Sequence, residues 1–226
     1  MAFDFENGEV LLIDKPLEWT SFDVVKKIRN TIKLKKIGHA GTLDPLATGL
    51  LILCTGKFTK RIDFYQSEEK EYTGKMVIGQ TTPSFDLETA VDSTTDISQI
   101  TSAQIREKSL PFIGIQEQIP PIYSAVKING ERSYNKARRG EDVVMKSREV
   151  HIKEFEITDI NLPEISFRLV CSKGTYVRSL VRDFGISLGV GAYMSELRRT
   201  RIGEFTVGNA YSLEGFLKAA RNEDIS

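Results

Sequence analysis

Cysteine and histidine are scarce in this chain of 226 residues, which has two of each. Cys54 and Cys171 lie far apart, each in an apolar run typical of a strand, so we expect buried, reduced thiols and no disulfide framework. His39 and His151 are too few for a histidine-rich metal site, and the sequence has no Cys-x-x-Cys pair. We therefore expect no metal site.

Long apolar runs are also missing. No stretch reaches the roughly 18 apolar residues of a membrane-spanning helix. The first residues, Met1-Ala2-Phe3-Asp4-Phe5-Glu6, lack the basic and then apolar pattern of a signal peptide. These two absences predict a protein without a membrane segment that resides in the cytoplasm.

Net charge is absent too, because 31 Lys and Arg residues balance 31 Asp and Glu residues. The cations nevertheless cluster, and clustered cations can follow a phosphate backbone at zero net charge. The alternative for each cluster is a solvated helix face or loop. The three clusters are Lys26, Lys27, Arg29, Lys33, Lys35 and Lys36, then Lys136, Arg138 and Arg139, then Arg198, Arg199 and Arg201.

Apolar periodicity and turn residues predict an alternation of helices and strands without strict βαβ order. Strands are expected over 9–14, 49–54, 72–78, 122–128, 150–160, 164–171 and 202–207. Helices are expected from Thr20 or Ser21 to 32, over 57–66, 101–110 and 133–139, and from Thr175 and Ser212 onward. Because several strands follow one another directly, the pattern favours an α+β fold with a mixed, largely antiparallel sheet flanked by helices. We expect one catalytic domain over residues 1–226, with excursions at about 81–100 and 120–148.

The most informative segment is Gly38-His39-Ala40-Gly41-Thr42-Leu43-Asp44-Pro45-Leu46-Ala47-Thr48-Gly49-Leu50-Leu51. Glycines punctuate it, and Pro45 keeps Asp44 out of the helical region, so the Asp44 carboxylate should be presented on a stiff turn. Taken alone, an Asp-Pro pair is more often a plain turn in which the carboxylate accepts a backbone N–H.

The whole segment closely resembles the catalytic signature of the TruB family, the bacterial tRNA pseudouridine-55 synthases. Further blocks match in the same order over about residues 8–208. They are Leu11-Leu12-Ile13-Asp14-Lys15-Pro16, Lys70-Glu71-Tyr72, Pro120-Pro121-Ile122-Tyr123-Ser124-Ala125-Val126-Lys127, Cys171-Ser172-Lys173-Gly174-Thr175-Tyr176-Val177-Arg178 and Leu197-Arg198-Arg199. The resemblance implies the family's α+β fold and isomerisation of uridine-55 in the T-loop of tRNA, without a cofactor.

The resemblance also implies roles for individual residues. Asp44 is the catalytic carboxylate, Arg178 pairs with it, and Tyr72 acts at the flipped base. His39 fills the space that the flipped base leaves, while Tyr176 and Leu197 line the base pocket. Lys15 and Lys173 are basic residues near the site. Outside the resemblance, both tyrosines would be assigned to the core, both lysines to solvated surface, and His39 to a hydrogen bond within its turn.

Several points stay open at this stage. Asp44 could add to C1′ or abstract a ribose proton, and the contribution of Asp86 to the site is not fixed. Relatives commonly carry a PUA domain after the catalytic part, and we expect none here. The alternatives to a stand-alone tRNA enzyme are a guide-RNA-dependent synthase and a non-catalytic tRNA-binding or folding protein. We expect a monomer that binds the T-arm of tRNA.

Overall fold

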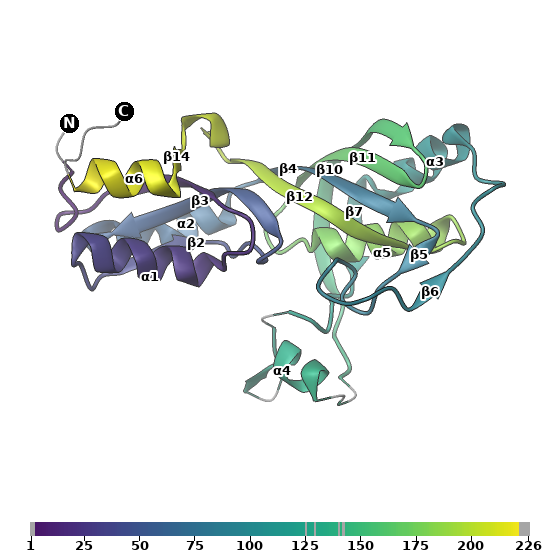
Figure 1. Cartoon of the computed structure of the whole chain (residues 1–226), viewed down its shortest axis with the longest axis horizontal. Helices are drawn as coiled ribbons and strands as arrows, with labels where there is room; N and C mark the ends of the chain where they lie inside the picture. The colour runs from purple at the N-terminus through teal and green to yellow at the C-terminus, as the bar shows by residue number, and fades with distance from the viewer. Residues whose placement is uncertain (1–2, 125, 129, 140, 142, 222–226) are drawn as a thin grey trace. The chain divides into compact units, whose positions relative to one another are not determined.

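The computed structural model describes residues 3–221 except 125, 129, 140 and 142, with the backbone alone at 127, 128, 132 and 138. The chain forms two compact units, coloured by residue number in Figure 1. Unit 1 takes the residues up to Thr73 and from Leu197 onward, and unit 2 is Gly74–Glu196. The predicted assignment of the whole chain to one catalytic domain stays a prediction.

The sheet of unit 1 has the strand order β14-β1-β3-β12, with β2 paired to β3 and β13 to β12. Strand β3 is antiparallel to β1 and β2 but parallel to β12, and β1 is parallel to β14, so the sheet is mixed. Its strands are β1 (Val10–Lys15), β2 (Ile37–Ala40), β3 (Ala47–Thr55), β12 (Ala192–Ile202), β13 (Phe205–Thr206) and β14 (Tyr211–Ser212).

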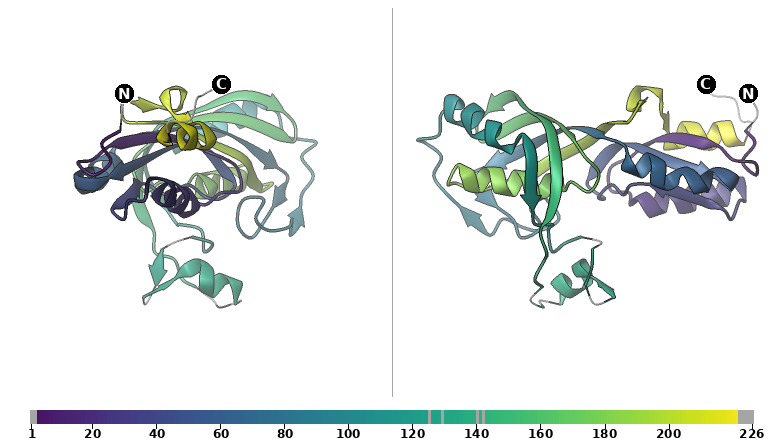
Figure 2. Two further views of the ribbon diagram at one scale, coloured as in Figure 1. Left: turned by 60° about the vertical axis from the view of Figure 1, so that its left-hand side comes forward. Right: turned by 180° about the vertical axis from the view of Figure 1, so that it is seen from behind.

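Strand β3 is apolar along most of its length because helices cover both of its faces. Leu51 and Leu53 pack into a cluster with α1 (Ser21–Ile32) and α6 (Leu213–Ala220), which lie side by side (Figures 1 and 2). Leu50 and Ile52 point the other way, into a cluster that includes Tyr65 of α2 (Ile62–Ser67). Burial of β3 on both sides therefore anchors the turn that precedes it.

Unit 2 carries the strand order β4-β11-β10-β7, with β10 antiparallel to both of its neighbours. In its core, Phe155 meets both Phe167 and Phe184 edge to face. The elements are β4 (Lys70–Ile78), β5 (Gln80–Thr81), β6 (Ser93–Thr94), α3 (Ser102–Ser109), β7 (Gly114–Gln118), β8 (Lys127–Ile128), β9 (Glu131–Arg132), α4 (Ser133–Arg138), β10 (Arg148–Asn161), β11 (Glu164–Cys171) and α5 (Val177–Ser187). The predicted α+β architecture is confirmed.

The helix starts predicted from capping residues are confirmed. Thr20 and Thr101 each form both hydrogen bonds of a capping box, at the starts of α1 and α3. The Ser212 side chain accepts from the Gly215 N–H at the start of α6. Local hydrogen-bond chemistry alone specifies such boundaries, which is why sequence placed them well.

Three other predictions were wrong in part. The strand predicted over 122–128 is reduced to β8, because the Ser124 N–H donates to the Ile122 carbonyl in a local turn. Ala125 and Asn129 lie outside the described residues. The helix predicted over 57–66 is a 3-10 turn, Gly56–Arg61, followed by α2. The final strand predicted over 202–207 is reduced to β13, while β12, which ends at Ile202, was not predicted, because it carries the charged residues Arg198, Arg199 and Arg201.

Candidate active site

Asp44 lies half-buried on the turn between β2 and β3 in unit 1. The turn opens at Gly41, whose φ of 84° is in the region that favours glycine. It closes where the Asp44 carbonyl accepts from the Ala47 N–H at 3.1 Å. The predicted stiff turn that presents Asp44 is therefore present.

Two buried groups brace this turn from the side of β1 and α1. Ser21, the first residue of α1, accepts from the Leu43 N–H at 2.9 Å and donates to the Leu43 carbonyl at 3.2 Å. Lys15, at the end of β1, donates from Nζ to the carbonyls of Pro16, Trp19 and Pro45 at 2.8, 2.6 and 3.3 Å. Both residues that flank Asp44 in sequence are thus held by hydrogen bonds.

Arg199 braces the same turn from β12. Its Nε donates to the Leu50 carbonyl at 2.7 Å, and its Nη2 donates to the Gly41 carbonyl at 3.2 Å. The backbone of Arg199 runs so close to Gly49 that a Cβ on that glycine would lie 2.3 Å from the Arg199 carbonyl oxygen. Position 49 therefore requires glycine for two reasons: its φ is 103°, which favours glycine, and the Arg199 backbone leaves no room for a Cβ.

Burial near the turn lowers the pKa values of two residues. Burial lowers the pKa of Lys15 to about 8, and the negative charge of Asp44 works against that shift. Burial, and then the nearby charge of Arg199, lower the pKa of His39 below its usual 6.5. His39, on β2, is therefore a neutral imidazole at pH 7, with Nε2 3.2 Å from Thr42 Oγ1.

The two remaining predicted site residues of unit 1 are mostly buried. Tyr72, in the first part of β4, which belongs to unit 1, is 8% exposed, and Leu197, on β12, is 8% exposed and lies opposite Ala47 of β3. Pairing with Ala47 places Leu197 at the end of the Asp44 turn. Unit 1 therefore brings Asp44, Lys15 and Leu197 to the Ala47 end of β3, whereas His39 pairs with Leu53, nearer the other end of the strand.

Arg178 belongs to unit 2, in the first turn of α5, and is 3% exposed. Its Nη1 donates to the Ser84 carbonyl at 3.1 Å and lies 3.4 Å from Asp86 Oδ2. Its Nη2 donates to the Tyr123 carbonyl at 2.9 Å. Asp86, whose contribution sequence left open, is a buried ionic partner of Arg178. The predicted pairing of Arg178 with Asp44 stays a prediction.

Tyr176 is half-buried and precedes α5, where Gln118 holds its backbone on both sides. The guanidinium of Arg148 lies over its ring, 4.4 Å from the ring centroid, in cation–π geometry. Lys173, three residues earlier, is exposed. The substrate roles predicted for both residues stay predictions.

Sequence reasoning named Lys15 and Arg199 but did not predict that they, together with Ser21, hold the Asp44 turn. Lys15 is fully buried, so its alternative assignment to solvated surface is wrong. Arg199 is 1% exposed and bonded to protein carbonyls, so the third basic cluster does not offer it to phosphates. Ser21 gave no sequence signal beyond its place next to a helix cap.

Two general features complete the description. Among residues 3–221, outside the four undescribed positions, no three His, Cys, Asp or Glu side chains group as metal ligands would. None of the helices described here has the length and apolar character needed to cross a membrane.

Helices on both faces of a mixed sheet in unit 1, and a carboxylate on a braced turn, define an α+β protein with a candidate nucleophile or general base. Residues 29–177 match the family model described as TruB family pseudouridylate synthase, N-terminal domain, and residues 178–225 match the tRNA pseudouridylate synthase B C-terminal domain. The chain therefore belongs to the TruB family of pseudouridylate synthases.

Curated relatives agree with this assignment. The chain is 52% identical over 220 residues to tRNA pseudouridine synthase B of Flavobacterium johnsoniae, covering 94% of this chain and 96% of that protein. It is also 52% identical to the protein of the same name from Phocaeicola vulgatus, covering 94% and 93%.

Among solved structures, the chain resembles one protein of a Cbf5-Nop10-Gar1 complex, with a TM-score of 0.74 and 31% identity. The match covers 95% of this chain and 54% of that chain, so the present sequence spans about half of the solved protein. An H/ACA RNP bound to a substrate RNA gives a TM-score of 0.72 at 26% identity, covering 98% and 57%.

Proposed function

We propose that this protein is a tRNA pseudouridine synthase that isomerises uridine-55 in the T-loop of tRNA. Support comes from the relatives named tRNA pseudouridine synthase B, which match at about half identity over nearly their full length. The observation in the structure that carries the proposal is the turn on which Lys15, Ser21 and Arg199 hold Asp44.

The reaction breaks the bond between C1′ of the ribose and N1 of uracil and forms a bond from C1′ to C5. The proton on C5 is lost and N1 gains one, so substrate and product have the same composition. An ionised carboxylate can begin this exchange by adding to C1′ or by removing a ribose proton. We propose Asp44 for this step, with Arg178 keeping it ionised and Tyr72 acting at C5.

A uracil stacked inside an RNA loop cannot reach a carboxylate on a protein turn, so the nucleotide has to be extruded. The neutral ring of His39 suits the space that the base leaves, because it can stack without carrying a charge into the loop. We assign Tyr176 and Leu197 to the pocket that receives the base, and Lys173 to a phosphate beside it.

The proposal includes the partner and the setting. The enzyme acts as a monomer in the cytoplasm on the T-arm of tRNA. A guide-RNA-dependent synthase is less well supported, because the chain is 31% identical to the chain of the Cbf5 complex but 52% identical to tRNA pseudouridine synthase B of Flavobacterium johnsoniae. The match to tRNA pseudouridine synthase B over 96% of that protein favours a stand-alone tRNA enzyme. It disfavours both a guide-RNA-dependent synthase and a non-catalytic tRNA-binding protein.

The test is to incubate an unmodified tRNA transcript with the protein and to map pseudouridine at single-nucleotide resolution. Wild type should modify the T-loop uridine, and Asp44→Asn should leave it unmodified. Asp63→Asn is the matched control, since Asp63 is an exposed aspartate on α2 of the same unit. Modification by Asp44→Asn at the wild-type rate would refute the role of Asp44, and no modification by wild type would refute the function.

A further inference from the structure

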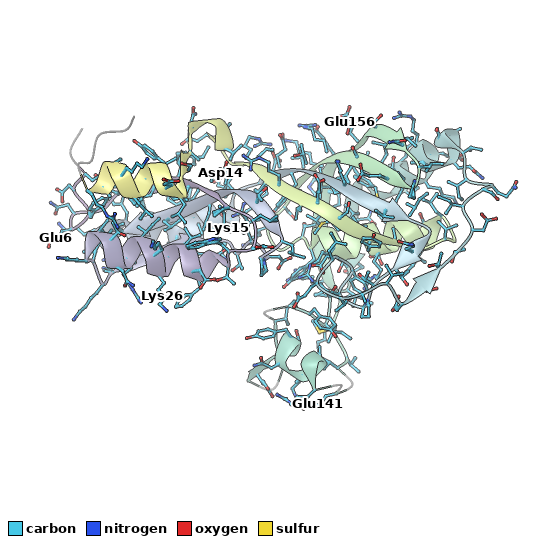
Figure 3. All side chains as sticks on the ribbon, viewed as in Figure 1. Glu6, Asp14, Lys15, Lys26, Glu141 and Glu156 are labelled. Atoms are coloured by element: carbon cyan, nitrogen blue, oxygen red, sulfur yellow. The ribbon has the colours of Figure 1, made fainter. Side chains whose placement is uncertain are left out.

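The outer face of α1 is strongly basic. Its inward stripe, with Val24, Val25 and Ile28, is buried, while Lys26 and Lys27 on the opposite side are exposed. Figure 3 labels Lys26 on this outer side. The loop that follows adds three exposed lysines, Lys33, Lys35 and Lys36. We call these five lysines the α1 patch.

The α1 patch differs from the other basic clusters in that acids do not neutralise it. Arg198 is paired with Asp14 at 2.7 Å, and Arg201 with Glu69 at 2.9 Å. Arg139 bonds to both Glu131 and Glu141. In the part of the chain that the structure describes, none of the five lysines of the α1 patch is in an ion pair. Its positive charge is therefore available to a ligand from outside.

An aromatic side chain stands at one end of the patch. Trp19 is half-exposed and lines two adjoining hollows, of about 340 and 520 Å³. Lys27 lines both hollows with it. These volumes are in the range of ligand pockets, which suits a nucleotide. Of the acids there, Asp14 binds Arg198 and Glu214 lies 3.6 Å from Lys218, while Glu18 and Asp23 are exposed carboxylates at the rim; the Asp23 side chain accepts from the Thr20 N–H.

The start of α1 adjoins the Asp44 turn, and the α1 patch extends from the middle of this helix into the loop that follows it. The carbonyl of Pro45 accepts from the Glu18 N–H at 2.9 Å, and Ser21 of α1 holds Leu43. An RNA whose target nucleotide lies at Asp44 therefore has flanking phosphates within reach of α1. With 12 residues, α1 is about 18 Å long, which matches roughly five base steps of a stacked strand.

We propose that the α1 patch is an RNA-docking surface in addition to the Asp44 site. The five lysines contact the phosphates that flank the target nucleotide, and Trp19 stacks on a base or ribose beside them. Cations that follow a backbone and an aromatic ring that accepts any base form the usual pattern of sequence-tolerant RNA binding. This inference rests on the proposed function for the identity of the RNA. The α1 patch should contribute to the affinity for RNA and to the position of the bound RNA, and it should take no part in breaking the glycosidic bond.

The experiment measures binding of an unmodified tRNA transcript to the full chain at several salt concentrations. The variants are Lys26→Gln/Lys27→Gln and Lys35→Gln/Lys36→Gln. The control is Lys57→Gln/Lys60→Gln, which removes two exposed lysines from the 3-10 turn of the same unit. Each α1 variant should weaken binding roughly tenfold at about 0.1 M salt and reduce the log–log salt slope by about 1.4–1.8, as loss of two phosphate contacts requires.

Trp19 provides an independent signal because it is the only tryptophan in the chain. Its fluorescence should be quenched as wild type is saturated with RNA. In turnover, the α1 variants should raise KM and leave kcat at saturating RNA unchanged.

Affinities and slopes equal to those of the control would overturn the docking surface, and unchanged Trp19 fluorescence at saturation would overturn the stacking. If wild type binds with both signatures yet forms no pseudouridine, the proposed function fails while the surface stands.

Discussion

Replacing Gly49 with alanine tests whether the contact between β3 and β12 positions the Asp44 turn. Alanine at a φ of 103° carries backbone strain of about 1–3 kcal/mol. The new Cβ would also lie 2.3 Å from the Arg199 carbonyl oxygen, where ordinary contacts begin near 3.4 Å, so the strands must separate by about 1 Å. Overpacking of this kind adds about 1–3 kcal/mol.

Gly114→Ala is the matched control. Gly114 has a φ of 107°, nearly the same strain, but a Cβ there would meet nothing within 4 Å. Urea unfolding followed by far-UV circular dichroism should therefore give a loss of about 1–3 kcal/mol for Gly114→Ala and about 2–6 kcal/mol for Gly49→Ala. If the two variants lose the same free energy of unfolding, the close approach between Gly49 and the Arg199 backbone contributes nothing to stability, and the argument is refuted.

The same displacement should lower activity. Arg199 bonds to Gly41 and Leu50, at the two ends of the segment that carries Asp44. A misplacement of about 1 Å in a catalytic group can cost about a hundredfold in rate. We expect Gly49→Ala to lose about that much kcat in the pseudouridine assay, while Gly114→Ala keeps it. A stable, folded Gly49→Ala with wild-type kcat would refute the bracing argument.

The other predictions concern buried groups. Ser21→Ala should cost about 1–3 kcal/mol of stability and lower kcat, because it leaves the buried Leu43 N–H without its bond; urea unfolding and the modification assay measure both. Since burial lowers the pKa of Lys15 to about 8 from 10.5, the unfolded chain binds more protons between those pH values. Wild type should therefore gain roughly 3 kcal/mol over Lys15→Met as the pH rises through that window, measured by unfolding at each pH. Burial raises the pKa of Cys54 to about 11, so its thiol should react with iodoacetamide at pH 8 only after denaturation, and rapid labelling of native Cys54 would contradict its burial.

Sequence predicted best where the cause is local. The capping boxes of Thr20 and Thr101 involve residues three apart, and their bonds form as expected. The apolar run of β3 indicated a buried strand because its residues from Leu50 to Cys54 alternate between two apolar clusters, one on each face. The Asp44 turn follows from Gly41 and the proline after Asp44, which act on neighbouring backbone angles.

Prediction failed where a side chain's environment comes from distant parts of the chain. Arg198 and Arg199 are adjacent in sequence and looked like one cationic surface. In the fold, Arg198 meets Asp14 of β1, and Arg199 turns inward to the carbonyls of Gly41 and Leu50, about 150 residues earlier. Alternation along β12 sends neighbours to opposite faces, so one arginine neutralises an acid while the other replaces water at buried carbonyls. No property of the Arg-Arg pair itself reveals this difference; only the strands beside it do. Lys26 and Lys27 of α1 form no ion pair in the part of the chain that the structure describes, which is why we propose them, and not Arg199, as contacts for RNA phosphates.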